Sequence, residues 1–399
     1  MISFRFLLQA LTTPWVVVRT IAQFYTIGTI YSRTDREFKN SLRKNLYISV
    51  LYHLSGTYSN EDVKTFVYRP VTTVFDYFRN HPMVTRPKLN NFGKQINGNS
   101  YWLVQNEIEG LNKEDVLIFF HGGGFSLNMF ETQFMGILAL YHAIPESHRS
   151  KISIVVVDYS LTCNDKRYPT QIEEGCECYK DLLKQGYTNL SIIGDSAGGN
   201  LALAINRIIS YPQEAKAHFS KFQPNHFTSF DWTALESYPQ PKSLILISPW
   251  VEPVTKPELP LKSGVDTTGD LGAQDITMGE WYLGDLSREE VNNFVSFTNT
   301  SFKQWDQVSP LLDQRRNLVI YGEREVLRDG IEKWIDITNG DSNGINHHLQ
   351  KGGTHDELFY IESWDFVGER GHDEHLDFSD KFSLDLAGKF LADIVDLPL

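Results

Sequence analysis

The sequence predicts an α/β fold in which a mostly parallel central sheet is flanked by helices. Short apolar runs rich in β-branched residues recur along the chain, and longer segments with helical spacing separate them. The composition agrees, because 41% hydrophobic and 22% charged residues are ordinary for a soluble globular protein. The expected strands span residues 100–105, 116–120, 152–157, 190–193, 244–248, 317–321 and 346–350.

Residues 1–95 precede the sheet and are expected to form helices, and residues 96–399 form the sheet-containing domain. Within the first part, residues 35–54 have helical spacing. Leu42, Leu46 and Val50 fall near one face of that helix, and we expect them to be buried there.

The first thirty residues leave three alternatives open. Residues 7–18 are apolar but contain Gln9 and Pro14, and Arg19 ends the run. The run is therefore shorter than the ~20 apolar residues that a membrane-spanning helix needs. A weakly hydrophobic anchor, an interfacial helix and a helix buried on the protein itself all fit this pattern.

Two long insertions interrupt the sheet-containing domain, at about 210–242 and 252–305. Insertions of this length usually carry function or additional structure. Their aromatic residues predict either an apolar pocket or lid, or plain packing of an added helix. These aromatic residues are Phe219, Phe222, Phe227, Phe230, Trp232, Trp281 and Tyr282.

A glycine-flanked serine lies between the expected strand 190–193 and a helical segment at 200–209. The segment reads Gly194-Asp195-Ser196-Ala197-Gly198. This pattern is typical of a nucleophile elbow, a strained strand-to-helix turn that projects the serine hydroxyl out of the sheet. We expect Asp195 to shape the turn rather than to take part in the chemistry.

A glycine-rich loop follows the expected strand 116–120 and reads His121-Gly122-Gly123-Gly124. Acyl transfer needs donors aimed at a developing oxyanion, and backbone N–H groups serve without reorganisation. The sequence therefore predicts an oxyanion hole made by Gly123 and Gly124, with Ala197 as the third donor.

The remaining members of a catalytic triad are expected in the order acid, then histidine. His355 follows the expected last strand, in the loop position that a catalytic base requires. Glu325 and Asp329 both follow the strand at 317–321, and we favour Glu325 as the acid with Asp329 as the alternative. His355 would then take the Ser196 proton while the carboxylate orients the imidazole.

Charge and metal-ligand patterns exclude several function classes. A net charge of −13 argues against a nucleic-acid partner and against strong attraction to anionic membranes. Three cysteines cannot form a disulfide framework. Residues 371–375 contain acidic and histidine side chains, but no second cluster completes a metal site. We expect neither a metal nor another cofactor.

Taken together, these motifs resemble the hormone-sensitive-lipase type of α/β-hydrolase esterases. The matching segments in family order are HGGGF, IVVVDYSL, GDSAGGNLA, LISPW and YGEREVLRD. The resemblance implies an α/β-hydrolase fold, a cap built by the N-terminal helices, and carboxylic-ester hydrolysis. Glu325 stands where the family usually has Asp.

The long aromatic N-terminus and the GGTHDE segment look most like the fungal steryl acetyl hydrolase branch. That resemblance implies esters of sterols or similar lipophilic alcohols as substrates. It also implies association with the endoplasmic reticulum membrane, with a cytoplasmic location as the alternative. A general acylglycerol or xenobiotic esterase is a second hypothesis, and a non-catalytic ligand-binding protein of the same fold is a third.

Overall fold

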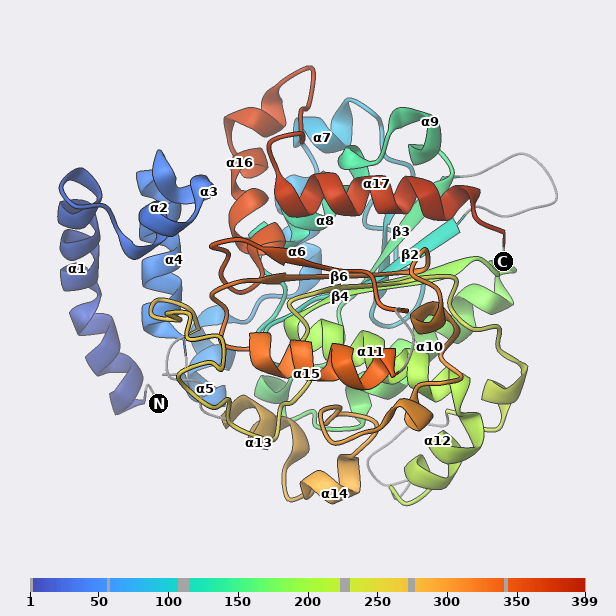
Figure 1. The fold of residues 1–399 in the computed structure, drawn as a ribbon. Coiled ribbons are helices and arrows are strands. Elements are labelled where there is room, and N and C mark those ends of the chain that lie inside the picture. The colour runs from blue at the N-terminus through green and yellow to red at the C-terminus, as the bar shows by residue number, and fades with distance from the viewer. Residues whose placement is uncertain are drawn as a thin grey trace.

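A computed structural model describes residues 3–55, 58–106, 115–222, 230–271, 277–340 and 344–398. A seven-stranded sheet crosses its centre in the order β1-β3-β2-β4-β5-β6-β7 (Figure 1). β1 pairs with β3 in antiparallel orientation, and the other neighbours are parallel. This confirms the predicted fold class. The strands are β1 (Ser100–Val104), β2 (Asp115–Phe120), β3 (Ile152–Val157), β4 (Leu190–Asp195), β5 (Leu244–Ile247), β6 (Asn317–Gly322) and β7 (His347–Gln350).

The central strands are buried on both faces, which explains their uninterrupted apolar sequences. In β2, Val116 and Ile118 join the hydrophobic core on one side of the sheet, whereas Leu117 and Phe119 join the core on the other. This alternation follows from the two-residue period of a strand. The sheet therefore has two hydrophobic cores, one on each face.

Helices cover both faces of the sheet (Figure 1). One face packs against α10 (Thr170–Lys184), α11 (Ser196–Ser210) and α15 (Arg328–Asn339). The other packs against α6 (Val71–Phe78), α8 (Glu131–Ala143) and α17 (Phe382–Asp396).

The N-terminal helices and several short helices complete the structure. The N-terminal ones are α1 (Phe4–Tyr25), α2 (Ile30–Thr34), α3 (Arg36–Lys39), α4 (Leu42–Leu54) and α5 (Asn60–Asp62). The other α-helices are α7 (Pro82–Thr85), α9 (Glu146–Arg149), α12 (Pro212–Phe219), α13 (Thr277–Leu283), α14 (Arg288–Val291) and α16 (Trp364–Val367). Two π-helical turns are η1 (Val63–Val67) and η6 (Leu358–Glu362). The 3-10 turns are η2 (Thr162–Asn164), η3 (Ala234–Ser237), η4 (Phe302–Gln304), η5 (Ser309–Leu312) and η7 (Glu369–His372).

The helix predicted over residues 35–54 is in fact two helices, α3 and α4, each with its own N-cap. Asp35 and Ser41 accept hydrogen bonds from backbone N–H groups two and three residues later, so each starts a new helix. The predicted buried face is also wrong, since Leu42, Leu46 and Val50 are only half-buried.

Ion pairs and hydrogen bonds decide which face of α4 is buried. Lys44, Asn45, Ile48 and Tyr52 are the buried residues of this helix. The Lys44 ammonium lies 2.6 Å from Glu37 and 2.9 Å from Asp365, so this buried charged residue is paired with two carboxylates. Hydrophobic periodicity cannot anticipate such a cluster.

α1 lies along the outside of the N-terminal part and packs mainly against α4 (Figure 1). Its outer surface carries an apolar stripe, with Phe4 79%, Leu11 70%, Trp15 68% and Val18 58% exposed. No helix within the described part of the chain is long and apolar enough to cross a membrane.

The described aromatic residues of the first insertion, Phe219, Phe222, Phe230 and Trp232, pack in or against the core. Phe219 stacks on Trp232 at 4.2 Å, and Phe230 is buried beside them. In the second insertion, Tyr282 stacks on Phe125 at 3.7 Å. Phe227 lies outside the described residues.

Candidate active site

The loops that carry the predicted site residues follow four parallel strands of the sheet. The glycine-rich loop follows β2, Ser196 follows β4, Glu325 follows β6 and His355 follows β7. Because parallel strands end at the same edge, the four loops meet there.

Ser196 occupies a strained turn between β4 and α11. Its φ of 48° lies in the left-handed region, which few non-glycine residues adopt. A Cβ at Gly194 would come within 2.2 Å of the Gly198 carbonyl oxygen, and one at Gly198 within 2.0 Å of the Phe120 carbonyl oxygen. Both flanking positions therefore require glycine, as expected of a nucleophile elbow.

The loop after β2 presents unused backbone donors beside this serine. Gly123 and Gly124 have φ values of 115° and 60°, and both line the same pocket as Ser196. Neither glycine N–H donates to any residue that the structure describes. The Gly122 N–H differs, because it donates to Asp195 Oδ1 at 2.8 Å and so anchors the loop. Ala197 lies in the first turn of α11, where N–H groups lack intrahelical partners.

His355 is buried, and burial lowers the pKa of its imidazole to about 3. A neutral ring at physiological pH is the form that accepts a proton. Its Nδ1 lies 3.9 Å from Glu325 Oε2 and has no closer hydrogen-bond partner among the described residues. The His355 backbone N–H donates to Asp270 Oδ1 at 2.8 Å.

Glu325 is fully buried beside this ring, whereas Asp329 is not. Glu325 Oε2 accepts hydrogen bonds from Ser248 Oγ at 2.6 Å and from the Gly322 N–H at 3.0 Å. Burial raises the pKa of Glu325 well above its ordinary value, and the Ser248 hydrogen bond opposes that rise. Asp329 instead accepts from the Lys262 backbone N–H and lines a different pocket.

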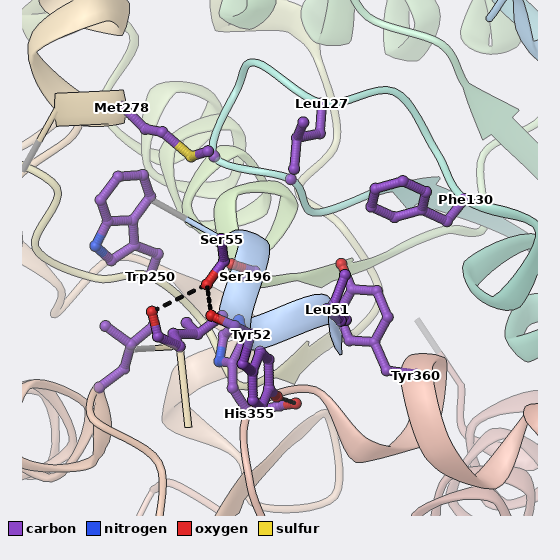
Figure 2. A pocket seen from close by; sticks show the side chains of 14 residues that line it. Leu51, Tyr52, Ser55, Leu127, Phe130, Ser196, Trp250, Met278, His355 and Tyr360 are labelled. Atoms are coloured by element: carbon purple, nitrogen blue, oxygen red, sulfur yellow. Dashed lines mark hydrogen bonds between the residues drawn. The ribbon is translucent and has the colours of Figure 1, made fainter. Parts of the chain in front are cut away.

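Ser196 and His355 open onto one pocket of about 830 Å³, its open mouth included. No hydrogen bond joins the Ser196 hydroxyl to the His355 ring in the described structure. Such contacts are often long without substrate and tighten when it binds. Figure 2 shows both residues among the apolar side chains of the pocket. The apolar lining consists of Leu51, Leu127, Phe130, Trp250, Leu271, Met278 and Leu327, with the rings of Tyr52 and Tyr360.

The pocket draws its walls from distant parts of the sequence. Leu51 and Tyr52 come from α4, and Leu271 and Met278 come from the second insertion. The Tyr52 hydroxyl donates to the His355 carbonyl oxygen at 3.0 Å, which joins the N-terminal part to the loop of the predicted base.

Sequence reasoning missed three polar residues around the predicted triad. Ser248 donates a hydrogen bond to Glu325, and Asp270 accepts one from the His355 backbone N–H. Asp356 lies beside the imidazole, with its Oδ2 3.7 Å from His355 Nε2. The LISPW and GGTHDE segments contain Ser248 and Asp356, but their contacts depend on tertiary structure. Nothing in the sequence around Asp270 signals its role.

Two family models match this chain. One describes an α/β hydrolase fold and matches residues 117–358. The other describes steryl acetyl hydrolases and matches residues 5–218, which is more than half of the chain. This protein belongs to the steryl acetyl hydrolase family. That family lies among the carboxylic-ester hydrolases, as the resemblance to hormone-sensitive-lipase-type esterases implied.

Curated relatives of this hydrolase include two fungal proteins. "Putative steryl acetyl hydrolase mug81" of Schizosaccharomyces pombe is 26% identical over 383 residues, covering 91% of this chain and 92% of the relative. "Steryl acetyl hydrolase 1" of Saccharomyces cerevisiae is 28% identical over 277 residues, which cover 65% of this chain and 57% of the relative. A crystal structure of a mutant of the esterase rPPE shares the fold, with a TM-score of 0.54 and 17% identity over 90% of this chain and 98% of the other.

Proposed function

We propose that this protein is a serine esterase that removes acetyl groups from sterols or similar lipophilic alcohols. The observation that carries the proposal is the apolar pocket onto which both Ser196 and His355 open. An apolar pocket with a few convergent polar groups suits a lipophilic ester. The similarity to steryl acetyl hydrolases supports the same substrate class.

In the proposed mechanism, Ser196 Oγ attacks the ester carbonyl while His355 removes the hydroxyl proton. Glu325 holds the imidazole in its working tautomer and stabilises the imidazolium that forms. The N–H groups of Gly123, Gly124 and Ala197 would stabilise the tetrahedral oxyanion. His355 then protonates the leaving alcohol, and a water molecule releases the acyl group from Ser196.

A substrate panel on the purified protein tests this function. Acetylated sterols, short-chain acylglycerols and p-nitrophenyl acetate are compared by kcat/KM, with Ser196→Ala as the control for background hydrolysis. We expect the highest kcat/KM with sterol acetates and a loss of about 10⁴-fold or more in the variant. Preference for acylglycerols would favour a general esterase. Binding of sterol esters without turnover would favour a ligand-binding protein.

We also propose that α1 lies in a lipid surface from which substrate is drawn. Its exposed apolar stripe spans the length of the helix, from Phe4 to Val18 and on to Tyr25. Such a stripe is typical of interfacial helices. The net charge of −13 favours a neutral lipid surface over an anionic one.

A further inference from the structure

Two buried carboxyl groups flank the proposed triad. Asp195 precedes Ser196, and Asp356 follows His355. Both side chains are completely buried, and their carboxyl groups contact one another. Asp356 has a φ of 61°, and its backbone N–H donates to Ser248 Oγ at 3.1 Å. The pair therefore lies between the loop of the nucleophile and the loop of the base.

The two carboxyl groups differ in their hydrogen-bond donors. Asp195 Oδ1 accepts from the Gly122 N–H at 2.8 Å, and Oδ2 accepts from Gln133 Nε2 at 2.7 Å. Neither oxygen of Asp356 has a donor among the described residues. The nearest ring nitrogen, His355 Nε2, is 3.7 Å away, which is too far for a hydrogen bond.

This asymmetry decides where a proton resides. An ionised Asp356 would be a buried carboxylate without donors, next to a second carboxylate, and such an arrangement is strongly unfavourable. Burial and the charge of Asp195 accordingly raise the pKa of Asp356 well above its ordinary value. A neutral Asp356 carries one O–H donor, and Asp195 is an acceptor in contact with it.

We propose that Asp356 holds a proton and donates it to ionised Asp195, so that the pair positions the base loop against the oxyanion loop. This inference rests on the proposed triad. Asp195 also accepts a hydrogen bond from the Gly122 N–H, and a Cβ at Gly122 would come within 2.4 Å of Asp195 Oδ2. One shared proton thus links the loops that carry Gly122, Ser196 and His355.

The shared proton also fixes the position of the negative charge. The charge resides on Asp195, and the group beside Nε2 of His355 is neutral. Nε2 is the ring nitrogen that faces Ser196 in a triad whose Nδ1 faces the acid. The other titratable groups facing the pair are His355, Glu325, Asp270, Tyr159 and Tyr360.

Three variants test this pair through kcat, KM and the pH profile of kcat/KM for p-nitrophenyl acetate. Asp356→Ala removes the donor, and we expect kcat to fall roughly tenfold or more because the base loop is no longer positioned against the oxyanion loop. Asp356→Asn supplies a neutral N–H donor of the same size, and we expect it to recover most of that loss. The exposed Asp377→Asn is the matched control for a lost carboxylate.

Asp195→Asn tests where the negative charge resides. A purely structural role of the pair predicts no change in the pH profile of kcat/KM. Its amide oxygen can accept from either the Gly122 N–H or the Gln133 amide but not from both, and its amide N–H can donate to Asp356, which can then ionise. The negative charge would move next to Nε2 of His355 and favour the imidazolium. We expect the acid limb of kcat/KM to move to higher pH by about one unit.

The proposal is overturned if Asp356→Asn is as impaired as Asp356→Ala, or if both are as active as the wild-type protein. An unshifted pH profile in Asp195→Asn also overturns it. If Asp356→Ala does not fold, the pH profiles of Asp356→Asn and Asp195→Asn test the proposal instead. Failure of the triad itself is distinguishable, because Ser196→Ala would then retain hydrolysis.

Discussion

At the scale of single residues, burial rather than a charged neighbour keeps the proposed base, His355, neutral. Burial lowers the pKa of His355 to about 3, so the ring is neutral from about pH 5 upward. An exposed histidine would instead become protonated near 6.5. The neutral ring leaves a lone pair for the Ser196 proton over the whole physiological range.

This state of His355 is measurable by NMR of histidine-labelled protein. The His355 signal is identified by its absence in His355→Gln. Between pH 8 and pH 5.5 we expect no protonation shift of that signal, because the folded-state pKa lies below this range. A midpoint near 6.5 would contradict the buried, neutral ring.

The choice between the two acids is also made at this scale. Glu325→Gln removes the carboxylate that lies 3.9 Å from His355 Nδ1, and we expect kcat to fall by about 10²-fold or more. Asp329→Asn removes a carboxylate bound to the Lys262 backbone, so kcat should change less than about threefold. Steady-state hydrolysis of p-nitrophenyl acetate separates them, and the reverse ranking would assign the acid role to Asp329.

Motifs predict residues whose chemistry depends on local spacing, and they miss residues whose partners come from elsewhere in the fold. Ser196 and the glycine loop could be proposed from local patterns, and His355 from its position after the last strand. Asp270 contacts His355 from 85 residues away in sequence. The contact between Asp195 and Asp356 likewise arises only when β4 and β7 join one sheet.

At the scale of elements, the second insertion joins the loop of the proposed acid, Glu325, to the loop of the proposed base, His355. Asp270 is buried, and its two carboxylate oxygens accept the backbone N–H groups of His355 at 2.8 Å and Val326 at 2.7 Å. Arg324 holds the same segment by donating to the Asp266 and Thr268 carbonyl oxygens. The sequence predicted a functional insertion here, but attributed that function to aromatic residues.

Asp270→Asn tests this connection. The amide oxygen can accept only one of the two N–H groups, and the amide N–H then opposes the other. We expect kcat to fall roughly tenfold while KM changes little, because the pocket wall stays in place. The exposed Asp266→Asn, in the same segment, is the control. Equal activity of the two variants would show that the connection is dispensable.

At the scale of the whole molecule, the N-terminal part is built into the site rather than appended to it. α4 supplies Leu51 and Tyr52 to the pocket. Lys381 binds Glu37 at 2.7 Å and Asp365 at 2.5 Å, which ties α3 to the C-terminal region. The mostly parallel sheet could be predicted from apolar runs, and the resemblance implied an N-terminal cap, whereas the buried faces of the N-terminal helices could not be predicted because ion pairs direct their packing.

α1 is the exception, because it lines no part of the pocket. We expect a protein with Leu11→Ser, Trp15→Ser and Val18→Ser to keep p-nitrophenyl acetate hydrolysis within about threefold of the wild-type protein, since these exposed side chains contribute little to the fold. Its flotation with phosphatidylcholine vesicles should be lost, because the apolar stripe is interrupted. Equal flotation of the two proteins would contradict the interfacial role of α1.

The central claim is that Ser196 is a nucleophile activated by His355. Mass spectrometry of peptides after fluorophosphonate treatment tests it most directly. We predict one adduct on the peptide containing Ser196 in the wild-type protein, and labelling slowed by about 10²-fold or more in His355→Gln. An adduct on another residue, or undiminished labelling in His355→Gln, would contradict the claim.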